Sequence, residues 1–181
     1  IANPQILSDN KINQKGQRIF YTYTAIPQSI GADSIPYITI MQVNKVLTKE
    51  PVFVEDNDAK DYGTDPIEIS GQSISKAHLN LRYTFLNGGN HLIPHSISLL
   101  IAKDAQPDAR GYLSAELRHD AADDLQLNAN SGYVSFTLEN MPGFKEGTLK
   151  GFKIKTKTIK NETDIVEVTM NNNRKSMNFN I

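Results

Sequence analysis

Period-2 alternation of apolar and polar residues is the feature that most constrains the fold of this chain. Between residues 77 and 85 every second side chain is apolar: Ala77, Leu79, Leu81, Tyr83 and Phe85. Successive side chains of a strand point to opposite faces, so this pattern predicts a strand with one buried face. No stretch of 12 residues or more keeps the i, i+3, i+4, i+7 spacing of an amphipathic helix. The alternation therefore predicts an all-β chain.

The same test predicts six further short strands between residues 66 and 171. Their buried positions are Ile67 and Ile69; Ile97, Leu99 and Ile101; Leu113, Ala115 and Leu117; Val134, Phe136 and Leu138; Phe152, Ile154 and Thr156; and Val166, Val168 and Met170. Turn residues such as Asn87-Gly88-Gly89-Asn90 separate the strands. Seven short strands at this spacing predict an immunoglobulin-like, two-sheet β-sandwich over residues 66–181.

The first fifty residues have a different pattern. Residues 17–25 and 36–49 read as two long strands joined by a polar connector. In the second strand the apolar parity changes from Ile38 and Ile40 to Met41, Val43 and Leu47, which predicts a β-bulge near residue 40 and places the last three on the apolar, inward face. Residues 50–65 hold six acidic residues against one lysine. We expect an N-terminal domain over 1–49, an acidic connector over 50–65 and a sandwich domain over 66–181.

Composition excludes several classes of function. The chain has no cysteine, which removes disulfides, zinc-thiolate sites and thiol nucleophiles. Its 19 basic and 20 acidic residues give a net charge of -1, which provides no bulk attraction for nucleic acid. Nucleic acid is therefore not an expected partner.

Six segments, in order, carry a resemblance to a known family. They are Gly16-Gln17-Arg18-Ile19, residues 40–49, residues 62–67 (YGTDPI), Leu79-Asn80-Leu81, residues 116–124 (ELRHDAADD) and residues 154–158 (IKTKT). Over residues 3–170 the chain resembles the NigD-like lipoproteins, named after a protein encoded with the bacteriocin nigrescin. The resemblance implies an exported, lipid-anchored protein of the bacterial outer membrane or cell surface, with an N-terminal OB-like domain before the sandwich and a bacteriocin-immunity type of role.

The resemblance also implies further residues before Ala2-Asn3-Pro4, with the first strands of the OB-like domain and the lipidated cysteine. We therefore expect a partial OB-like barrel, followed by the immunoglobulin-like sandwich. Its open edge would be covered by the sandwich, a partner chain or a swapped segment, so a homo-oligomer through this edge is an expectation.

Polar residues crowd the end of the strand around Leu113–Leu117. They are Glu116, Arg118, His119, Asp120, Asp123 and Asp124. One interpretation is a metal or acid/base cluster; the other is that Arg118 pairs with a carboxylate while Asp120 or Asp123 caps a turn. The resemblance attaches no catalytic role to this stretch, so no catalytic, cofactor-binding or metal-binding residue is assigned. The remaining histidines, His78, His91 and His95, are expected at the surface.

Lys153, Lys155 and Lys157 share the face of their strand opposite Phe152 and Ile154. Such a row of lysines is either a solvated face that protects an edge strand, or a docking stripe for an anionic partner or phospholipid headgroups.

The chain lacks the motifs of common enzyme classes. It contains no G-x-S-x-G nucleophile elbow and no phosphate-binding glycine loop. We therefore expect a non-enzymatic protein without a cofactor, and the resemblance implies an envelope protein that presents a macromolecule-binding surface to a protein or glycan. The alternative is a glycan or small-ligand binding module beside a surface import system, which would need a concave apolar cleft with convergent tyrosine and asparagine side chains.

Overall fold

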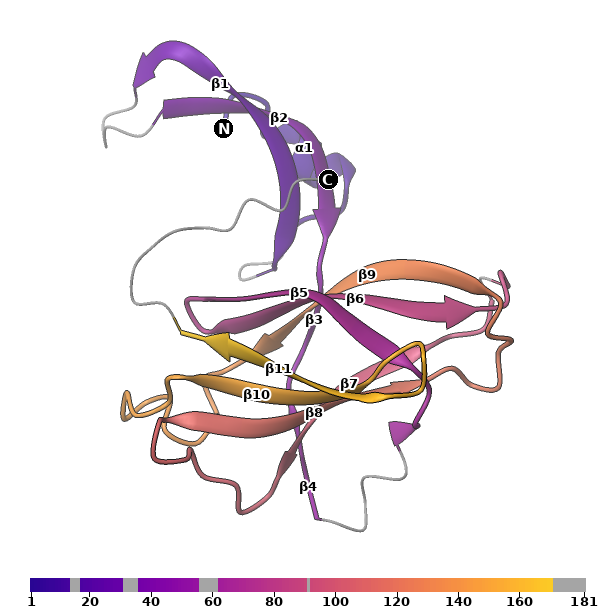
Figure 1. The fold of residues 1–181 in the computed structure, drawn as a ribbon. Helices are drawn as coiled ribbons and strands as arrows, with labels where there is room; N and C mark the ends of the chain where they lie inside the picture. The colour runs from indigo at the N-terminus through magenta and orange to yellow at the C-terminus, as the bar shows by residue number, and fades with distance from the viewer. Residues whose placement is uncertain (14–16, 31–35, 56–61, 91, 171–181) are drawn as a thin grey trace. The chain divides into compact units, whose positions relative to one another are not determined.

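The computed structural model describes residues 1–13, 17–30, 36–55, 62–90 and 92–170 (Figure 1). The chain forms two compact units, Ile1–Thr48 and Lys49–Ile181. Its regular structure is almost entirely strand, as the alternation predicted. In the described part of the chain no helix has the length and hydropathy that a membrane crossing requires.

The first unit contains a two-stranded antiparallel sheet and one short helix. Helix α1 spans Gln5–Asp9, β1 spans Ile19–Ile30 and β2 spans Pro36–Lys45. Thr22 lies opposite Gln42, whereas Tyr23 lies opposite Ile40, so Met41 is left without a partner. The predicted bulge is thus confirmed. The inward placement of Met41 is wrong, because the bulged residue turns outward and is 65% exposed, while Ile40 and Val43 are buried. The inward placement of Leu47 is also wrong, because it is 50% exposed.

The segment before α1 covers the outer edge of β2. Ala2 donates its backbone N–H to the Ile38 carbonyl. The Asn3 side chain makes two bonds of 2.8 Å to Ile40, donating from Nδ2 to its carbonyl and accepting at Oδ1 from its N–H. These bonds imitate a strand pairing, and no closed barrel forms among the described residues of this unit.

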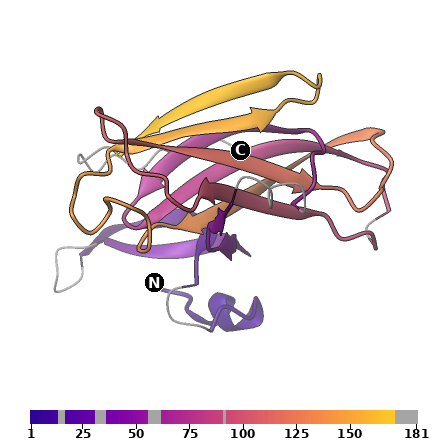
Figure 2. The ribbon, with the colours of Figure 1, turned by 90° about the horizontal axis from the view of Figure 1, so that it is seen from below.

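The second unit is a sandwich of two sheets (Figures 1 and 2). One sheet has the order β11 (Thr163–Thr169), β10 (Gly151–Lys157), β8 (Tyr112–Asp120), β7 (Ser96–Ala102) and β4 (Val52–Val54). The other has the order β3 (Leu47–Lys49), β9 (Asn128–Thr137), β6 (His78–Asn87) and β5 (Ile67–Ser75). Strand β3 contains the boundary between the two units, which falls after Thr48. Strand β8 pairs antiparallel with β7 and parallel with β10, so the sheet is mixed.

All seven strands expected after residue 66 form, and their predicted inward faces make one core. Leu79, Leu117, Phe136, Phe152 and Ile154 are almost completely buried. The Thr156 hydroxyl donates to the Ile67 carbonyl and so links β10 of one sheet to β5 of the other. The core therefore lies between two sheets, which the Thr156–Ile67 hydrogen bond also joins directly.

Two strands of three residues were not expected as separate elements. The long strand predicted over 36–49 is interrupted at Val46, and Leu47–Lys49 form β3. Val52–Val54, in the stretch expected as a connector, form β4, which pairs parallel with β7. A strand of three residues is too short to show a period-2 alternation. The sequence pattern therefore does not reveal β3 and β4, which form by pairing with strands of the neighbouring sheets. Residues 56–61 of the same stretch lie outside the described residues.

Candidate functional site

Strand β8 separates the predicted polar cluster onto different faces. Glu116 and Arg118 point to the outer face of their sheet, whereas His119 points inward and is 1% exposed. Asp120 ends the strand, and its Oδ1 accepts the Ala122 N–H at 2.9 Å as a turn cap. Asp123 is exposed in this turn. Within the described residues, no three His, Asp or Glu side chains are placed to hold a metal ion.

His119 belongs to a buried chain of hydrogen bonds. Its Nδ1 lies 3.0 Å from the Pro66 carbonyl oxygen, and its Nε2 lies 2.9 Å from Nδ1 of His95. Nε2 of His95 lies 3.1 Å from Oδ2 of Asp124. The chain connects the residue before β5, the end of β8, the residue before β7 and the turn after β8.

Asp124 is fixed as an ionised acceptor at the end of this chain. Its side chain is only 3% exposed, yet it accepts backbone N–H groups of Gly88 and Leu125, each at 2.9 Å. The hydrogen bond from Gly88 lowers the pKa of Asp124, with smaller contributions from His95 and Leu125, and these outweigh the opposing effect of burial. A Cβ on Gly88 would lie 2.6 Å from Asp124 Oδ1, so the close approach requires glycine.

Phe85, in β6, packs against the imidazole rings of both histidines. Its ring centroid lies 5.2 Å from that of His95 and 5.5 Å from that of His119, in edge-to-face geometry. In this apolar setting burial lowers the pKa of His119, more than the hydrogen bond to Pro66 raises it. His119 is therefore held as a neutral imidazole.

The expectation that His95 lies at the surface is wrong. Its side chain is 11% exposed and is bonded to both His119 and Asp124. The spacing of His95 to His91 does not reveal its partner, because that partner lies across the β7–β8 pairing. Ile97 is opposite His119 in that pairing, so aligning the two predicted strands in an antiparallel register could have brought His95 to the end of β8. His78 is half-buried, and His91 lies outside the described residues.

The segment before β5 is bonded to the sandwich at each residue from Gly63 to Pro66. The bonds are Arg118 Nη1 to Gly63 O (3.1 Å), Lys157 Nζ to Thr64 O (3.0 Å), Asp65 N to His119 O (3.0 Å), Ala121 N to Asp65 Oδ2 (2.8 Å) and His119 Nδ1 to Pro66 O (3.0 Å). Three of the segments that carry the family resemblance, 62–67, 116–124 and 154–158, therefore meet here. Their side chains have a structural role in joining β5 to β8 and β10.

The outer face of the five-stranded sheet carries an ionic network. Glu116 Oε1 lies 3.0 Å from Arg118 Nε and 3.4 Å from Lys155 Nζ, so one carboxylate serves two cations. Lys153 Nζ lies 2.7 Å from Asp108 Oδ2. The hydrogen bond from Lys153, with a further one from the Tyr112 N–H, lowers the pKa of Asp108 to about 2. The structure thus joins Glu116 and Arg118 of the predicted cluster to Lys155 of the predicted lysine stripe, whereas Lys153 of that stripe pairs with Asp108.

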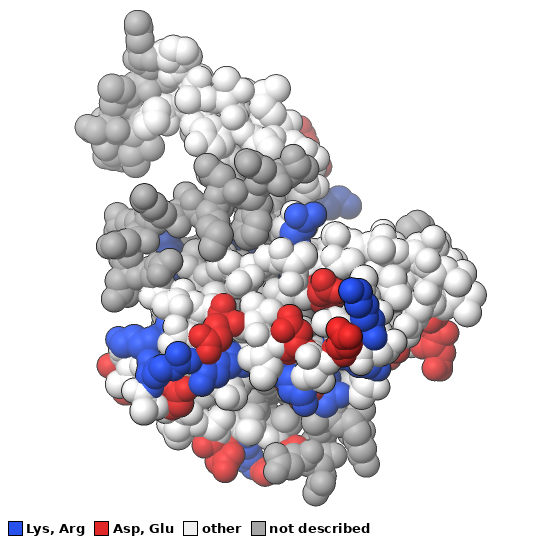
Figure 3. Space-filling view, viewed as in Figure 1, with Lys and Arg blue, Asp and Glu red and all other residues white. Residues whose placement is uncertain are grey.

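These side chains border a shallow depression of about 480 Å³ on the same face. Its apolar lining includes Val54, Leu100, Ala102 and Ile165, and Ile165 is 61% exposed. Charged side chains of both signs lie interspersed over this unit (Figure 3). The depression offers an apolar floor inside a polar and charged rim.

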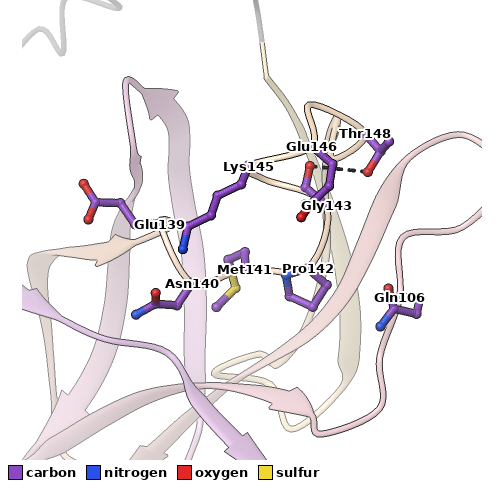
Figure 4. Close-up of a pocket in the computed structure, with 9 residues that line it drawn as sticks. All are labelled: Gln106, Glu139, Asn140, Met141, Pro142, Gly143, Lys145, Glu146 and Thr148. Carbon is purple, nitrogen blue, oxygen red and sulfur yellow. Dashed lines mark hydrogen bonds between the residues drawn. The ribbon is translucent and has the colours of Figure 1, made fainter.

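A second open depression, of about 530 Å³, lies at the turns after β9 (Figure 4). It is lined by Gln106, Glu139, Asn140, Met141, Pro142, Gly143, Lys145, Glu146 and Thr148. The Thr148 hydroxyl donates to the Gly143 carbonyl at 3.3 Å, and the charged side chains of the lining are exposed. Neither depression is lined by tyrosine, the residue type that a glycan-binding cleft in this chain would need.

Comparison with known families assigns the sandwich. The model of the NigD-like C-terminal beta sandwich domain matches residues 50–170, which include all strands from β4 to β11. The chain belongs to the NigD-like family. None of the curated proteins matches it.

Solved structures of Bacteroides and Parabacteroides proteins share the fold. A protein of unknown function from Bacteroides vulgatus is 20% identical, with a TM-score of 0.73 over 91% of this chain and 76% of that chain. A protein from Parabacteroides distasonis is 27% identical, with a TM-score of 0.65 over 85% and 73%. A NigD-like immunity protein from Bacteroides caccae is 16% identical, with a TM-score of 0.60 over 83% and 71%.

Proposed function

We propose that this NigD-like chain is a non-enzymatic, exported and lipid-anchored envelope protein that binds a macromolecular partner on the outer face of the β11-β10-β8-β7-β4 sheet. The depression on that face carries the proposal. Three cations, Arg118, Lys153 and Lys155, and one carboxylate, Glu116, line it around an apolar floor. A surface of this kind fits a protein partner that inserts an apolar side chain flanked by carboxylates.

The ion pairs on this face do not prevent such binding. The Lys155 and Glu116 side chains are 52% and 28% exposed, and those of Lys153 and Asp108 are 32% and 37% exposed. Exposed ion pairs contribute about 0–1 kcal/mol each, so a partner carboxylate can replace an internal one at little cost. The surplus positive charge would steer an acidic partner toward the floor.

The buried histidine chain supports a structural rather than a catalytic reading. Its contacts end at a backbone carbonyl and at a carboxylate that is itself bonded to the backbone, and among the described residues no Ser, Thr or Lys side chain takes part in it. A general base must reach a substrate or a nucleophile. His119 reaches neither, because it is 1% exposed and both its ring nitrogens are occupied.

Membership of the family supports export and a bacteriocin-immunity type of role, which one of the solved relatives has in its name. Immunity is tested by deleting the gene, challenging the cells with the cognate bacteriocin, and restoring the gene. Survival of the deletion strain equal to that of the parent would refute the immunity role and leave the binding surface to the following experiment.

Replacing Lys153 and Lys155 with glutamine is expected to reduce partner capture from a detergent extract of the native envelope at least tenfold. Glutamine keeps most of the aliphatic stem but removes both charges from the rim. Lys157 is left intact because it holds the Thr64 carbonyl. Capture is measured by quantitative mass spectrometry at low and at physiological salt, and the loss should be greater at low salt because salt screens charge.

The matched control replaces Lys145 and Lys160, which are exposed and lie outside the depression, with glutamine. It removes the same charge and should leave capture unchanged. Glu116→Gln, which raises the positive charge of the rim, should strengthen capture at low salt. Equal capture by both lysine variants, or binding of a neutral glycan instead of a protein, would argue against this surface.

A further inference from the structure

The buried hydrogen bonds that link Pro66, His119, His95 and Asp124 require a particular number of ring protons on the two histidines. At one end is the Pro66 carbonyl oxygen, which can only accept a hydrogen bond, and at the other is the ionised Asp124 carboxylate, which can also only accept. Nδ1 of His119 and Nε2 of His95 must therefore both carry a proton. The bond between the two rings needs one more, on either His95 Nδ1 or His119 Nε2.

Three ring protons are thus needed, whereas two neutral imidazoles carry two and two imidazoliums carry four. With two protons, one of the three contacts sets a nitrogen lone pair against another acceptor. With four, two N–H groups face each other across the 2.9 Å between the rings. Only a His95–His119 pair with one net positive charge allows all three hydrogen bonds between Pro66 and Asp124 to form.

The surroundings place this charge on His95. His95 is bonded to the Asp124 carboxylate, whereas the described partners of the His119 ring are His95 and the Pro66 carbonyl, neither of which is a carboxylate. Asp65, before β5, and Asp120, at the end of β8, raise the pKa of His119. Burial lowers this pKa by a larger amount, and the charge of His95 lowers it as well. The ring of Phe85, from β6, packs against both imidazoles, and the β7 residue opposite His119 in the strand pairing is the apolar Ile97. His119 is the neutral acceptor in the middle of the chain.

We infer that the Asp124–His95–His119 chain is a pH-sensitive latch, which closes only when the two imidazoles together carry a single positive charge. It ties together three segments: the β6–β7 connection, the turn after β8 and the residues before β5. The first two expose large apolar side chains, with Leu92 89%, Leu125 64% and Leu127 69% exposed. Opening of the latch removes the bonds that His95 adds between these segments, whereas the bonds from Gly88 to Asp124 and from Leu127 to Asn87 do not involve a histidine.

The sign of the pH dependence follows from the proton count. In the unfolded chain both imidazoles titrate near their ordinary pKa of about 6.5. Above that pH the unfolded pair binds two protons and the folded pair three, so stability falls as pH rises until the folded pair loses its third proton. Below it the unfolded pair binds four against three, so stability falls as pH falls. The latch therefore contributes most near pH 6.5, and each flank approaches a tenfold change in the folding equilibrium constant per pH unit.

Nuclear magnetic resonance of the ring nitrogens tests the proton count in the wild-type protein. In nitrogen-15-labelled protein near pH 6.5, His95 and His119 should show three protonated ring nitrogens and one unprotonated, His119 Nε2. His78, in the same spectrum, serves as an internal reference. Two or four protonated nitrogens on the pair at that pH would overturn the inference.

Denaturant unfolding at a series of pH values from about 5.5 to about 8.5, which brackets the ordinary imidazole pKa, tests the coupling to stability. The wild type should show the two-sided profile. Asp124→Asn removes the charge that retains the third proton, so its alkaline flank should flatten, whereas His78→Gln should keep both flanks. The readout is the slope, so a uniform loss of stability does not imitate the effect. An Asp124→Asn profile parallel to that of the wild type would contradict the latch.

Discussion

Replacing Phe152 with alanine is expected to lower the free energy of unfolding of the sandwich by about 3–5 kcal/mol. Phe152 is 0% exposed in β10, the strand between β8 and β11, and belongs to the core between the two sheets. Truncating it removes most of a large buried side chain and leaves a cavity that the neighbouring strands can fill only in part. Because the chain has no tryptophan, unfolding by urea is best followed by circular dichroism.

Phe53→Ala is the matched control, because Phe53 is 40% exposed on the three-residue edge strand β4. The same truncation there should cost about 1–2 kcal/mol, since part of the ring stays in water on folding. A loss at Phe152 no larger than the loss at Phe53 would mean that the core is not packed as the structure shows. The conservative change Phe152→Leu should recover more than half of the lost stability.

Alternation along the sequence predicted the sandwich well because each of its strands has one face in the core. From Leu79 in β6 to Val168 in β11 most of the core residues are those that the parity test selected; Met141 and Leu149, between β9 and β10, are additions that it did not predict. This test sees only local order. It found the bulge at Met41 from a change of parity, but it placed the bulged residue inward because it cannot tell which residue leaves the pairing.

The candidate site was harder to predict because it depends on which strands become neighbours. His95 and His119 are 24 residues apart and meet only because β7 and β8 pair in one particular register. Glu116 and Lys155 meet through the parallel pairing of β8 with β10, a connection that no local pattern reveals. Composition correctly identified residues 116–124 as unusually polar. Only the fold shows that they divide between a buried chain, a turn cap and an ionic face.

Replacing Gly63 with alanine is expected to destabilise the sandwich by about 3 kcal/mol or more, through the backbone rather than the core. Gly63 has a φ of +72°, and a Cβ there would lie 2.4 Å from the His119 carbonyl oxygen and 2.6 Å from Asp120 Cα. Both obstacles are backbone atoms of β8, so the segment before β5 must move away and weaken the bonds of Asp65 and Pro66 to His119.

Gly147→Ala separates the two causes of this loss. Gly147 also has a φ of +72°, but nothing lies within 4 Å of an added Cβ, so only the cost of the left-handed conformation applies, about 1–2 kcal/mol. The difference between the two variants in urea unfolding measures the close approach of residue 63 to β8. Since this approach positions the Pro66 carbonyl against His119, Gly63→Ala should also flatten the pH dependence of stability, and Gly147→Ala should not. Equal losses in the two variants would show that the segment before β5 does not need its contact with β8.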